Sequence, residues 1–387
     1  MSTEKYMDKY EWLNKLEYKK FVTPFIIERD DQYFDDLRFK YQSLISQMEE
    51  YQADDEMLKI AHLYVDNIIR SIELYYRGDI GKSQEIMDCL LDDCLNDSIA
   101  VSNINNSIAF SKMGHLDDME VQFYRARLND NVTDFNAKNM LHIPFNKRGI
   151  IKSERFSIPG LPCLYLGNTS YVCWLEMNMP ADFRFNVSPI RLDNTQKVLN
   201  LTVGIRDFFG VIQDETMKGE DKENYIFSML KLLILAIATS YKVKDGNRSF
   251  KSEYIISQMI MLSCKNRGLD GITYFSKCVS DEIFARVVGI NVVLFAKYNG
   301  ESEYSDICNH LEVDDSFNFA MFKQLLLPAK QRHYNLRIDR SPYIQAIGTF
   351  DRQFSYRDTE FYEFDKFLFG MWEDNKRRAR LRKDKDS

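Results

Sequence analysis

The chain contains few of the residues that interrupt regular structure. Of its 387 residues only 8 are proline and 16 are glycine, while 45% are hydrophobic and 28% are charged. This composition can fill a hydrophobic core and argues against extended disorder. Because a chain of this length is long for one core, two domains are the first expectation.

The sequence also lacks an apolar run long enough to cross a bilayer. Its most apolar stretch, Met229–Ala238, is short and contains Lys231. A membrane-spanning helix needs about 20 mostly apolar residues, so we predict a buried helix here. The first residues, Met1–Lys5, have no apolar core of the kind that a signal peptide requires. We therefore expect no membrane association.

Paired cysteine motifs are missing as well. None of the seven cysteines belongs to a Cys-x-x-Cys pair, and only His310 lies close to one of them in sequence. An odd number of cysteines without a secretion signal is typical of reduced thiols in a reducing compartment. The sequence thus predicts a cytoplasmic protein that needs no metal. The cysteines are Cys89, Cys94, Cys163, Cys173, Cys264, Cys278 and Cys308.

The chain has no excess of positive charge, since its net charge is −7. A general nucleic-acid binder needs a basic surface to displace counterions, so this class is disfavoured. The exception is local, at the strongly basic stretch Lys376–Lys385. We interpret it as a solvated chain end, with a partner contact or a nucleic-acid contact as the alternatives.

The common nucleotide-binding motifs are absent or incomplete. No Gly-x-Gly-x-x-Gly corner occurs, so any dinucleotide site is not of the Rossmann type. Gly78–Ser83 looks like the end of a phosphate-binding P-loop, but Tyr76 stands where that motif needs its first glycine. A helix also precedes it in place of the required strand. A turn between two helices explains the segment better.

Residues 1–115 have the pattern of a small helical domain. Apolar residues recur at helical spacing from Leu58 to Tyr75, and the glycines of Gly78–Gly81 end that helix. A second helix is expected from about Ser83 to Leu95, running back against the first.

From about residue 116 to 345 short β-like runs alternate irregularly with helices, which favours an α+β domain over a doubly wound parallel sheet. Helices are expected near 225–240 and over Ser252–Asn266. Residues 346–387 form a third segment, rich in aromatic rings and ending in the basic stretch, and its rings are expected to pack onto the body or onto another subunit. The expected strands are Val121–Arg125, Cys163–Leu166, Lys197–Val203, Ile272–Ser276 and Asn291–Ala296.

One stretch, Arg155–Glu176, brings together an arginine, a tyrosine and a glutamate. Pro159 and Gly160 favour a tight turn, a short apolar strand follows, and Gly167–Ser170 breaks the strand and offers a helix cap. A strand-to-helix corner places the end of the strand and the start of the helix around one cleft. The alternative is plain packing, with a buried Tyr165, a surface Arg155 and a Glu176 on a helix face.

Three segments in this order resemble the RES-domain family. They are Phe123–Arg127, the Arg155–Glu176 stretch and Asp270–Ser276, followed by the apolar run Gly289–Phe295 that resembles the strand closing the family's domain. The resemblance covers about half the chain. It implies a compact relative of the ADP-ribosyltransferase fold with a mixed β-sheet, which binds NAD and consumes it.

The resemblance also assigns residues. Arg125 takes the place of the first signature arginine, with Arg127 as the alternative if the strand register is shifted by two. Arg155 matches the arginine of a Gly-Arg-Trp-Asn-like turn, although Glu154 and Phe156 replace the usual glycine and tryptophan. Three further residues also match the family pattern. Tyr165 corresponds to the tyrosine of the apolar strand, Glu176 to the signature glutamate and Ser276 to the signature serine.

These residue types suit cleavage of NAD at the nicotinamide–ribose bond. Arg125 and Arg155 could grip the two phosphates, because guanidinium is planar, always charged and able to form paired hydrogen bonds. Cleavage builds positive charge on the sugar, which the carboxylate of Glu176 could stabilise.

Three further side chains are candidates for this cleft. Tyr165 could stack on nicotinamide, and Ser276 could hydrogen-bond ribose or hold Glu176 in place. His142, between the two arginine motifs, could line the cleft or be an ordinary buried or surface histidine.

Three functions remain open. The first is an NAD-degrading enzyme that passes ADP-ribose to phosphate or water and acts as a toxin or defence effector. The second is an ADP-ribosyltransferase acting on a protein or nucleic acid. The third is a binding module without catalysis, which retention of all the site residues disfavours. The resemblance implies an antitoxin partner, and a homo-oligomer is also possible.

Overall fold

The computed structural model describes residues 10–97, 99–104, 123–130, 135–193, 195–213, 219–246, 248–279, 288–330, 346–349 and 352–371. Both predicted domain boundaries, near 115 and 345, lie outside these ranges, as does the basic stretch Lys376–Lys385. The helices named below are α2 (Gln32–Glu50), α3 (Asp55–Tyr76), α4 (Ile80–Leu95), α6 (Ser170–Glu176), α7 (Ile205–Gln213), α8 (Glu220–Thr239), α9 (Ile255–Asn266) and α11 (Phe319–Lys330). The strands are β1 (Phe25–Ile27), β2 (Val101–Asn103), β3 (Phe123–Leu128), β4 (Cys163–Gly167), β5 (Phe185–Leu192), β6 (Lys197–Leu201), β7 (Tyr241–Val243), β8 (Gly271–Phe275), β9 (Ile290–Phe295), β10 (Leu311–Val313), β11 (Phe317–Asn318), β12 (Ala346–Thr349) and β13 (Arg352–Ser355).

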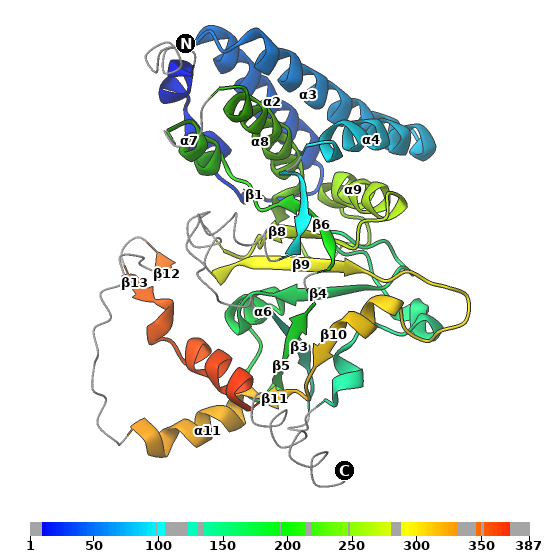
Figure 1. The fold of residues 1–387 in the computed structure, drawn as a ribbon, viewed down its shortest axis with the longest axis vertical. Helices are drawn as coiled ribbons and strands as arrows, with labels where there is room; N and C mark the ends of the chain where they lie inside the picture. Colours follow the sequence, from blue (N-terminus) through cyan, green and yellow to red (C-terminus); the bar gives the residue numbers. More distant parts are fainter. Residues whose placement is uncertain are drawn as a thin grey trace.

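A mixed sheet forms the centre of the molecule (Figure 1). Its strands follow the order β10-β5-β3-β4-β9-β8-β6-β2, and β11 also pairs with β5. Strands β6 and β8 run parallel, whereas β9 is antiparallel to both β4 and β8. The predicted α+β class with a mixed sheet is therefore confirmed. The more specific likeness to ADP-ribosyltransferases stays a prediction.

The N-terminal helices pack against helices from the middle of the chain (Figure 1). Helices α8 and α9 contact β6 and β8, while α3 packs on α8 and α4 packs on α9. The hydroxyl of Tyr33 donates to the carbonyl of Ala238 at 2.9 Å, and that of Tyr41 to Ile234 at 2.7 Å. Helices α2 to α4, α8, α9 and one face of the sheet thus share a continuous hydrophobic core.

The helices expected from apolar spacing are present. Helix α3 contains the predicted Leu58–Tyr75 pattern, and Gly78 follows it with a φ of +85° that favours glycine. The P-loop-like segment leads directly into α4, and the buried hydroxyl of Ser83 donates to the carbonyl of Ser71 at 2.7 Å. This confirms that the segment is an inter-helix turn.

The most apolar stretch of the sequence lies inside α8. All residues of Met229–Ala238 except Lys231 are buried there, as predicted. Within the described ranges no helix is long and apolar enough to span a membrane.

Strand β5 was not expected, because Pro189 and the polar Asn186 and Ser188 hide its pattern. It pairs with β3 on one side and with β10 and β11 on the other, and Pro189 lies opposite Tyr124. Its first six residues are all buried, so β5 is an interior strand despite its proline.

Part of the aromatic C-terminal segment packs onto the body, as expected. Residues 360–371 are helical, and Phe364, Leu368 and Phe369 are buried against Tyr124 and the aromatic side chains of α11. The described rings of this segment therefore belong to the fold of the same chain.

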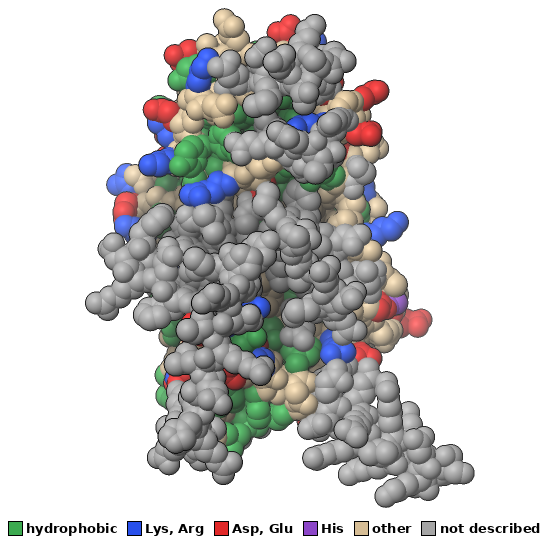
Figure 2. Space-filling model, turned by 60° about the vertical axis from the view of Figure 1, so that its left-hand side comes forward, with side chains coloured by type: hydrophobic (Ala, Val, Ile, Leu, Met, Phe, Trp, Pro, Cys, Tyr) green, Lys and Arg blue, Asp and Glu red, His purple; other side chains and the backbone are tan. Residues whose placement is uncertain are grey.

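Charges of both signs are interspersed over the described surface on the face shown in Figure 2, and neither gathers into a continuous patch there.

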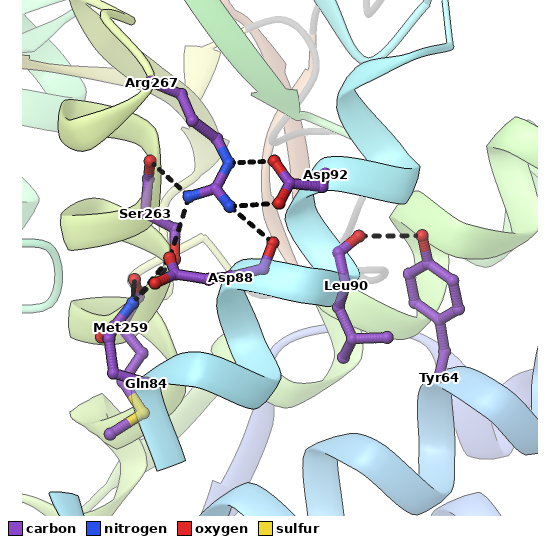
Figure 3. A network of polar contacts seen from close by, with 8 residues as sticks. All are labelled: Tyr64, Gln84, Asp88, Leu90, Asp92, Met259, Ser263 and Arg267. Carbon is purple, nitrogen blue, oxygen red and sulfur yellow. Dashed lines mark hydrogen bonds and ion pairs between the residues drawn. The ribbon is translucent and has the colours of Figure 1, made fainter. Parts of the chain in front are cut away.

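A network of polar contacts joins α4 to α9 (Figure 3). Arg267 lies 2.9 Å from Asp88 and 2.5 Å from Asp92, and it also donates to the carbonyl of Asp88 at 2.8 Å. Its planar guanidinium makes these contacts together, which fixes the N-terminal helices over the site-bearing half of the chain.

We predict that Arg267→Lys destabilises the fold. A lysine cannot reproduce the forked contacts with Asp88 and Asp92, so the free energy of unfolding should fall by about 1–2 kcal/mol. Arg29→Lys is the matched control, because Arg29 and Asp31 form a pair whose side chains are 72% and 69% exposed, and such pairs contribute little. Urea denaturation of both variants measures the difference. Equal midpoints for the two variants would contradict a stabilising role for the network.

Candidate active site

A cavity of about 430 Å³ opens where β4, β8 and β9 meet α6. The register of the sheet brings three wall residues side by side, because Asn291 of β9 lies opposite both Gly167 of β4 and Tyr274 of β8. Opposed residues of neighbouring strands point to the same face of a sheet. Tyr165, two residues before Gly167, lies on that face as well.

The β4–α6 corner depends on Gly167. A Cβ atom at this position would lie 2.4 Å from Cγ1 of Val172 and 2.9 Å from Sγ of Cys173, so only glycine lets α6 fold this closely over the strand. The side chain of Thr169 then caps α6 by accepting a hydrogen bond from the Val172 amide at 3.1 Å. This corner carries Glu176 to the cavity at the last turn of the helix.

Glu176 is held by two other strands of the sheet. The hydroxyl of Ser276 donates to its Oε1 at 2.7 Å, and Nδ2 of Asn291 donates to the same oxygen at 2.7 Å. Among the described residues, the second oxygen, Oε2, has only the weak thiol donor of Cys278 at 3.9 Å. Because the Glu176 side chain is exposed and lines the cavity, Oε2 can accept a hydrogen bond from a bound ligand.

Ser276 stands behind this carboxylate, outside the residues that line the cavity. It is 2% exposed, and its oxygen also accepts from the amide of Cys278 at 3.0 Å. Of the two roles considered for it, the geometry favours holding Glu176.

Arg155 is buried in the cavity wall and does not lie at the surface. Its guanidinium donates to the carbonyl of Phe275 at 2.9 Å and to Oγ of Ser240 at 3.3 Å. The rings of Phe156 and Tyr274 lie 5.1 Å and 4.6 Å from it. Burial lowers the pKa of Arg155, while nearby tyrosines and Glu176 act against that shift. Arg155 thus fixes the strand end from which Ser276 follows.

The two candidate signature arginines are placed differently. Arg125 lines the cavity and donates to the carbonyl of Tyr165 at 3.0 Å. Burial, with the charge of Arg127 beside it, lowers the pKa of Arg125 to about 9. Arg127 donates to the carbonyl of Leu141 at 2.9 Å and does not line the cavity.

Tyr165 is half-buried in the cavity wall, where burial raises the pKa of its hydroxyl well above the usual value and keeps it neutral. His142 is not in the wall. Its Nε2 accepts from the amide of Ser305 at 3.0 Å, so Nδ1 carries the proton and donates to the carbonyl of Ile143 at 2.8 Å. His142 is a buried structural residue.

Several wall residues were missed from the sequence. Asn291 had a signal, since it is a polar residue inside an apolar strand. Tyr274 had a weaker sequence signal, because it stands two residues before Ser276 and alternate residues of a strand point to the same face. The others are brought in by the fold alone, namely Glu154, Tyr254 and Lys277. Within the described ranges, no cluster of His, Cys, Asp or Glu could hold a metal ion.

The C-terminal segment supports α6 from the other side. Asp365 accepts from the amide of Ser170, the first residue of α6, at 3.1 Å, and the Tyr356 hydroxyl donates to its other oxygen. The ring of Phe361 also lies against Tyr171 and Trp174 of α6. The helix that carries Glu176 is therefore fixed at both ends.

Two known proteins are similar to parts of this chain. No protein-family model matches the chain. It is 30% identical over 245 residues to a Bacillus subtilis (strain 168) protein described as "Putative toxin YopC", which covers 61% of this chain and 52% of the relative. The chain thus spans about half the length of this curated relative.

Among solved structures, a chain of the M. tuberculosis MbcT–MbcA toxin–antitoxin complex is similar. The match covers 53% of this chain and 87% of that chain, at 12% identity and a TM-score of 0.27. A likeness at this score carries no weight for the fold.

The burial of Asp365 beside the start of α6 should make the free energy of unfolding depend on pH. Burial raises the pKa of Asp365 to about 7, above its unfolded value. The folded state then binds this proton more tightly, so the stabilisation is complete at low pH and is lost as the pH rises through about 7. We predict that the free energy of unfolding falls between pH 4 and 7, with a contribution from this group on the order of 3 kcal/mol.

Asp365→Asn keeps an acceptor for the Ser170 amide and removes the titration, so it should flatten this part of the pH profile. Asp358→Asn, at an exposed position, should leave the profile unchanged. Urea denaturation at each pH provides the measurement. A wild-type slope in Asp365→Asn would show that Asp365 does not titrate in this way.

Proposed function

We propose that this protein cleaves NAD at the bond between nicotinamide and ribose. The observation that carries the proposal is the fixed carboxylate of Glu176, which lines the cavity. Its Oε1 accepts from Ser276 and Asn291, while Oε2 meets only the weak thiol donor of Cys278 among the described residues. Arginine and tyrosine side chains line the same cavity. A carboxylate held in a fixed orientation among cations and aromatic rings suits this reaction.

The chemistry needs little else from the protein. When the bond between ribose C1′ and the pyridinium nitrogen breaks, its electron pair leaves with nicotinamide, which departs as a neutral molecule. No acid has to protonate the leaving group. Positive charge builds on the ribose ring, and a carboxylate fixed beside it stabilises that charge. Through Oε2, Glu176 can also accept a hydrogen bond from a ribose hydroxyl.

The remaining wall residues suit binding of the dinucleotide. Arg125, held by the carbonyl of Tyr165, can face a phosphate group. The rings of Tyr165, Tyr254 and Tyr274 give the cavity flat apolar surfaces on which nicotinamide can stack. The cavity volume of about 430 Å³ is in the range of small-molecule sites.

Phosphate or water is the proposed acceptor, with the protein acting in the cytoplasm as a toxin or defence effector that depletes NAD. Similarity to a relative described as a toxin supports the toxin role. An antitoxin partner and assembly into a homo-oligomer belong to the same proposal. The alternative is transfer of ADP-ribose to a protein or nucleic acid, which would use the same residues.

We predict that Glu176→Gln lowers NAD turnover by a factor of about 100 or more, because it keeps the size of the side chain and removes the charge that stabilises the transition state. Nicotinamide release from purified protein measures this. Glu50→Gln, at an exposed position at the end of α2, should retain full activity. Full activity in Glu176→Gln would contradict the catalytic role proposed for Glu176.

The acceptor is identified in the same assay. Reactions run with and without inorganic phosphate, and with and without lysate proteins, separate phosphorolysis, hydrolysis and transfer to a macromolecule. If the wild-type protein leaves NAD intact under all these conditions, both enzyme functions fail.

A further inference from the structure

Lys277 occupies an unusual position in the cavity wall. It follows Ser276 directly, is half-buried and lines the cavity. Its Nζ lies 4.4 Å from the centroid of the Tyr254 ring, and within the described residues it forms no hydrogen bond or ion pair. Lys231, also shielded from solvent, is by contrast 2.9 Å from Asp93 and 3.2 Å from Asp97.

A second cation lies in the same wall. Arg155 is 6% exposed, and while its two terminal nitrogens are bonded, its buried Nε has no acceptor within the described part of the chain. Burial, followed by repulsion from Arg155, lowers the pKa of Lys277 to about 7. Two cations in one partly shielded wall repel each other, and an anion bound to both would relieve the repulsion.

The described carboxylates around this pair act on Lys277 from a distance and form no ion pair with it. Glu176 is directed to Ser276 and Asn291 through Oε1. Glu253 is bonded to Arg248 at 2.8 Å. Glu154 lines the cavity, and burial raises its pKa while the charges of Lys251 and Lys277 act against that shift. The remaining groups near Lys277 are Tyr254 and the Cys278 thiol. None of these described groups forms an ion pair with Lys277, so within the described residues its amine is open to an anion supplied by a ligand.

We propose that Arg155 and Lys277 form a subsite for a phosphate group beside Glu176. This rests on the proposed NAD cleavage and names a residue that neither the resemblance nor the residue pattern assigned. A phosphate group suits the pair because it carries negative charge on several oxygens, which a lysine and an arginine can share.

The phosphate group has two possible sources. It is either part of the NAD diphosphate or a free inorganic phosphate that acts as the acceptor. In the second case a phosphate oxygen bonds to ribose C1′ as the bond to nicotinamide breaks, and the electron pair of that bond leaves with nicotinamide. No oxidant or further reactant is needed.

Chemical labelling tests the subsite without relying on turnover. At pH 7 about half of the Lys277 amines are neutral, given the pKa of about 7, against roughly 0.04% of an ordinary lysine. An amine-reactive acyl ester should therefore modify Lys277 at least ~10-fold faster than the exposed Lys59, as measured by peptide mass spectrometry. Adding inorganic phosphate or NAD, in separate reactions, should slow the labelling of Lys277 alone. Labelling of Lys277 that neither compound slows would overturn the subsite.

Kinetics identify the source of the phosphate group. Lys277→Gln should raise KM at least ~10-fold for NAD if the subsite holds the diphosphate, or for inorganic phosphate if it holds the acceptor. Lys277→Arg should restore part of the loss, and Lys59→Gln serves as the control. Unchanged KM values for both compounds would contradict the proposal. A wild-type protein that releases no nicotinamide would refute NAD cleavage instead, and the labelling result would then decide on the subsite separately.

Discussion

Glu176 accepts hydrogen bonds at a single oxygen from Ser276 and Asn291, and this contact joins α6 to the ends of β8 and β9. Much of the surrounding structure serves to keep it in place. Gly167 allows α6 to fold over β4, Asp365 fixes the start of the helix, and Arg155 fixes the end of β8. A carboxylate oriented from three directions needs little reorganisation when positive charge develops next to it.

The fold imposes a second constraint, which is electrostatic. The cavity is lined by three cationic side chains, Arg125, Arg155 and Lys277, and by two carboxylates, Glu154 and Glu176. Burial lowers the pKa of each of these cations, so their charged forms are costly without a ligand. A ligand that carries phosphate groups and a positively charged glycosidic centre, as NAD does, complements both sets of charges.

The sequence predicted the parts of this site that follow from local patterns. The β4–α6 corner, the strand of Arg125, the strand that ends just before Ser276 and the buried helix α8 all have recognisable apolar patterns or turn residues. Strand β5 was missed because Pro189 obscures it. No local sequence pattern identified Lys277, because its proposed role depends on Arg155, which is far away in the sequence. The inward position of Arg155, bonded to the Phe275 carbonyl, likewise follows only from the fold.

The central claim is that the carboxylate at this strand–helix corner serves cleavage of the nicotinamide–ribose bond. Proton NMR of NAD incubated with the purified wild-type protein tests this most directly, because the nicotinamide ring signals shift when the ring is released from ribose. The account predicts that free nicotinamide accumulates with time, in equal amount to the NAD that disappears. An unchanged NAD spectrum in the presence of phosphate, water and candidate protein acceptors would contradict it.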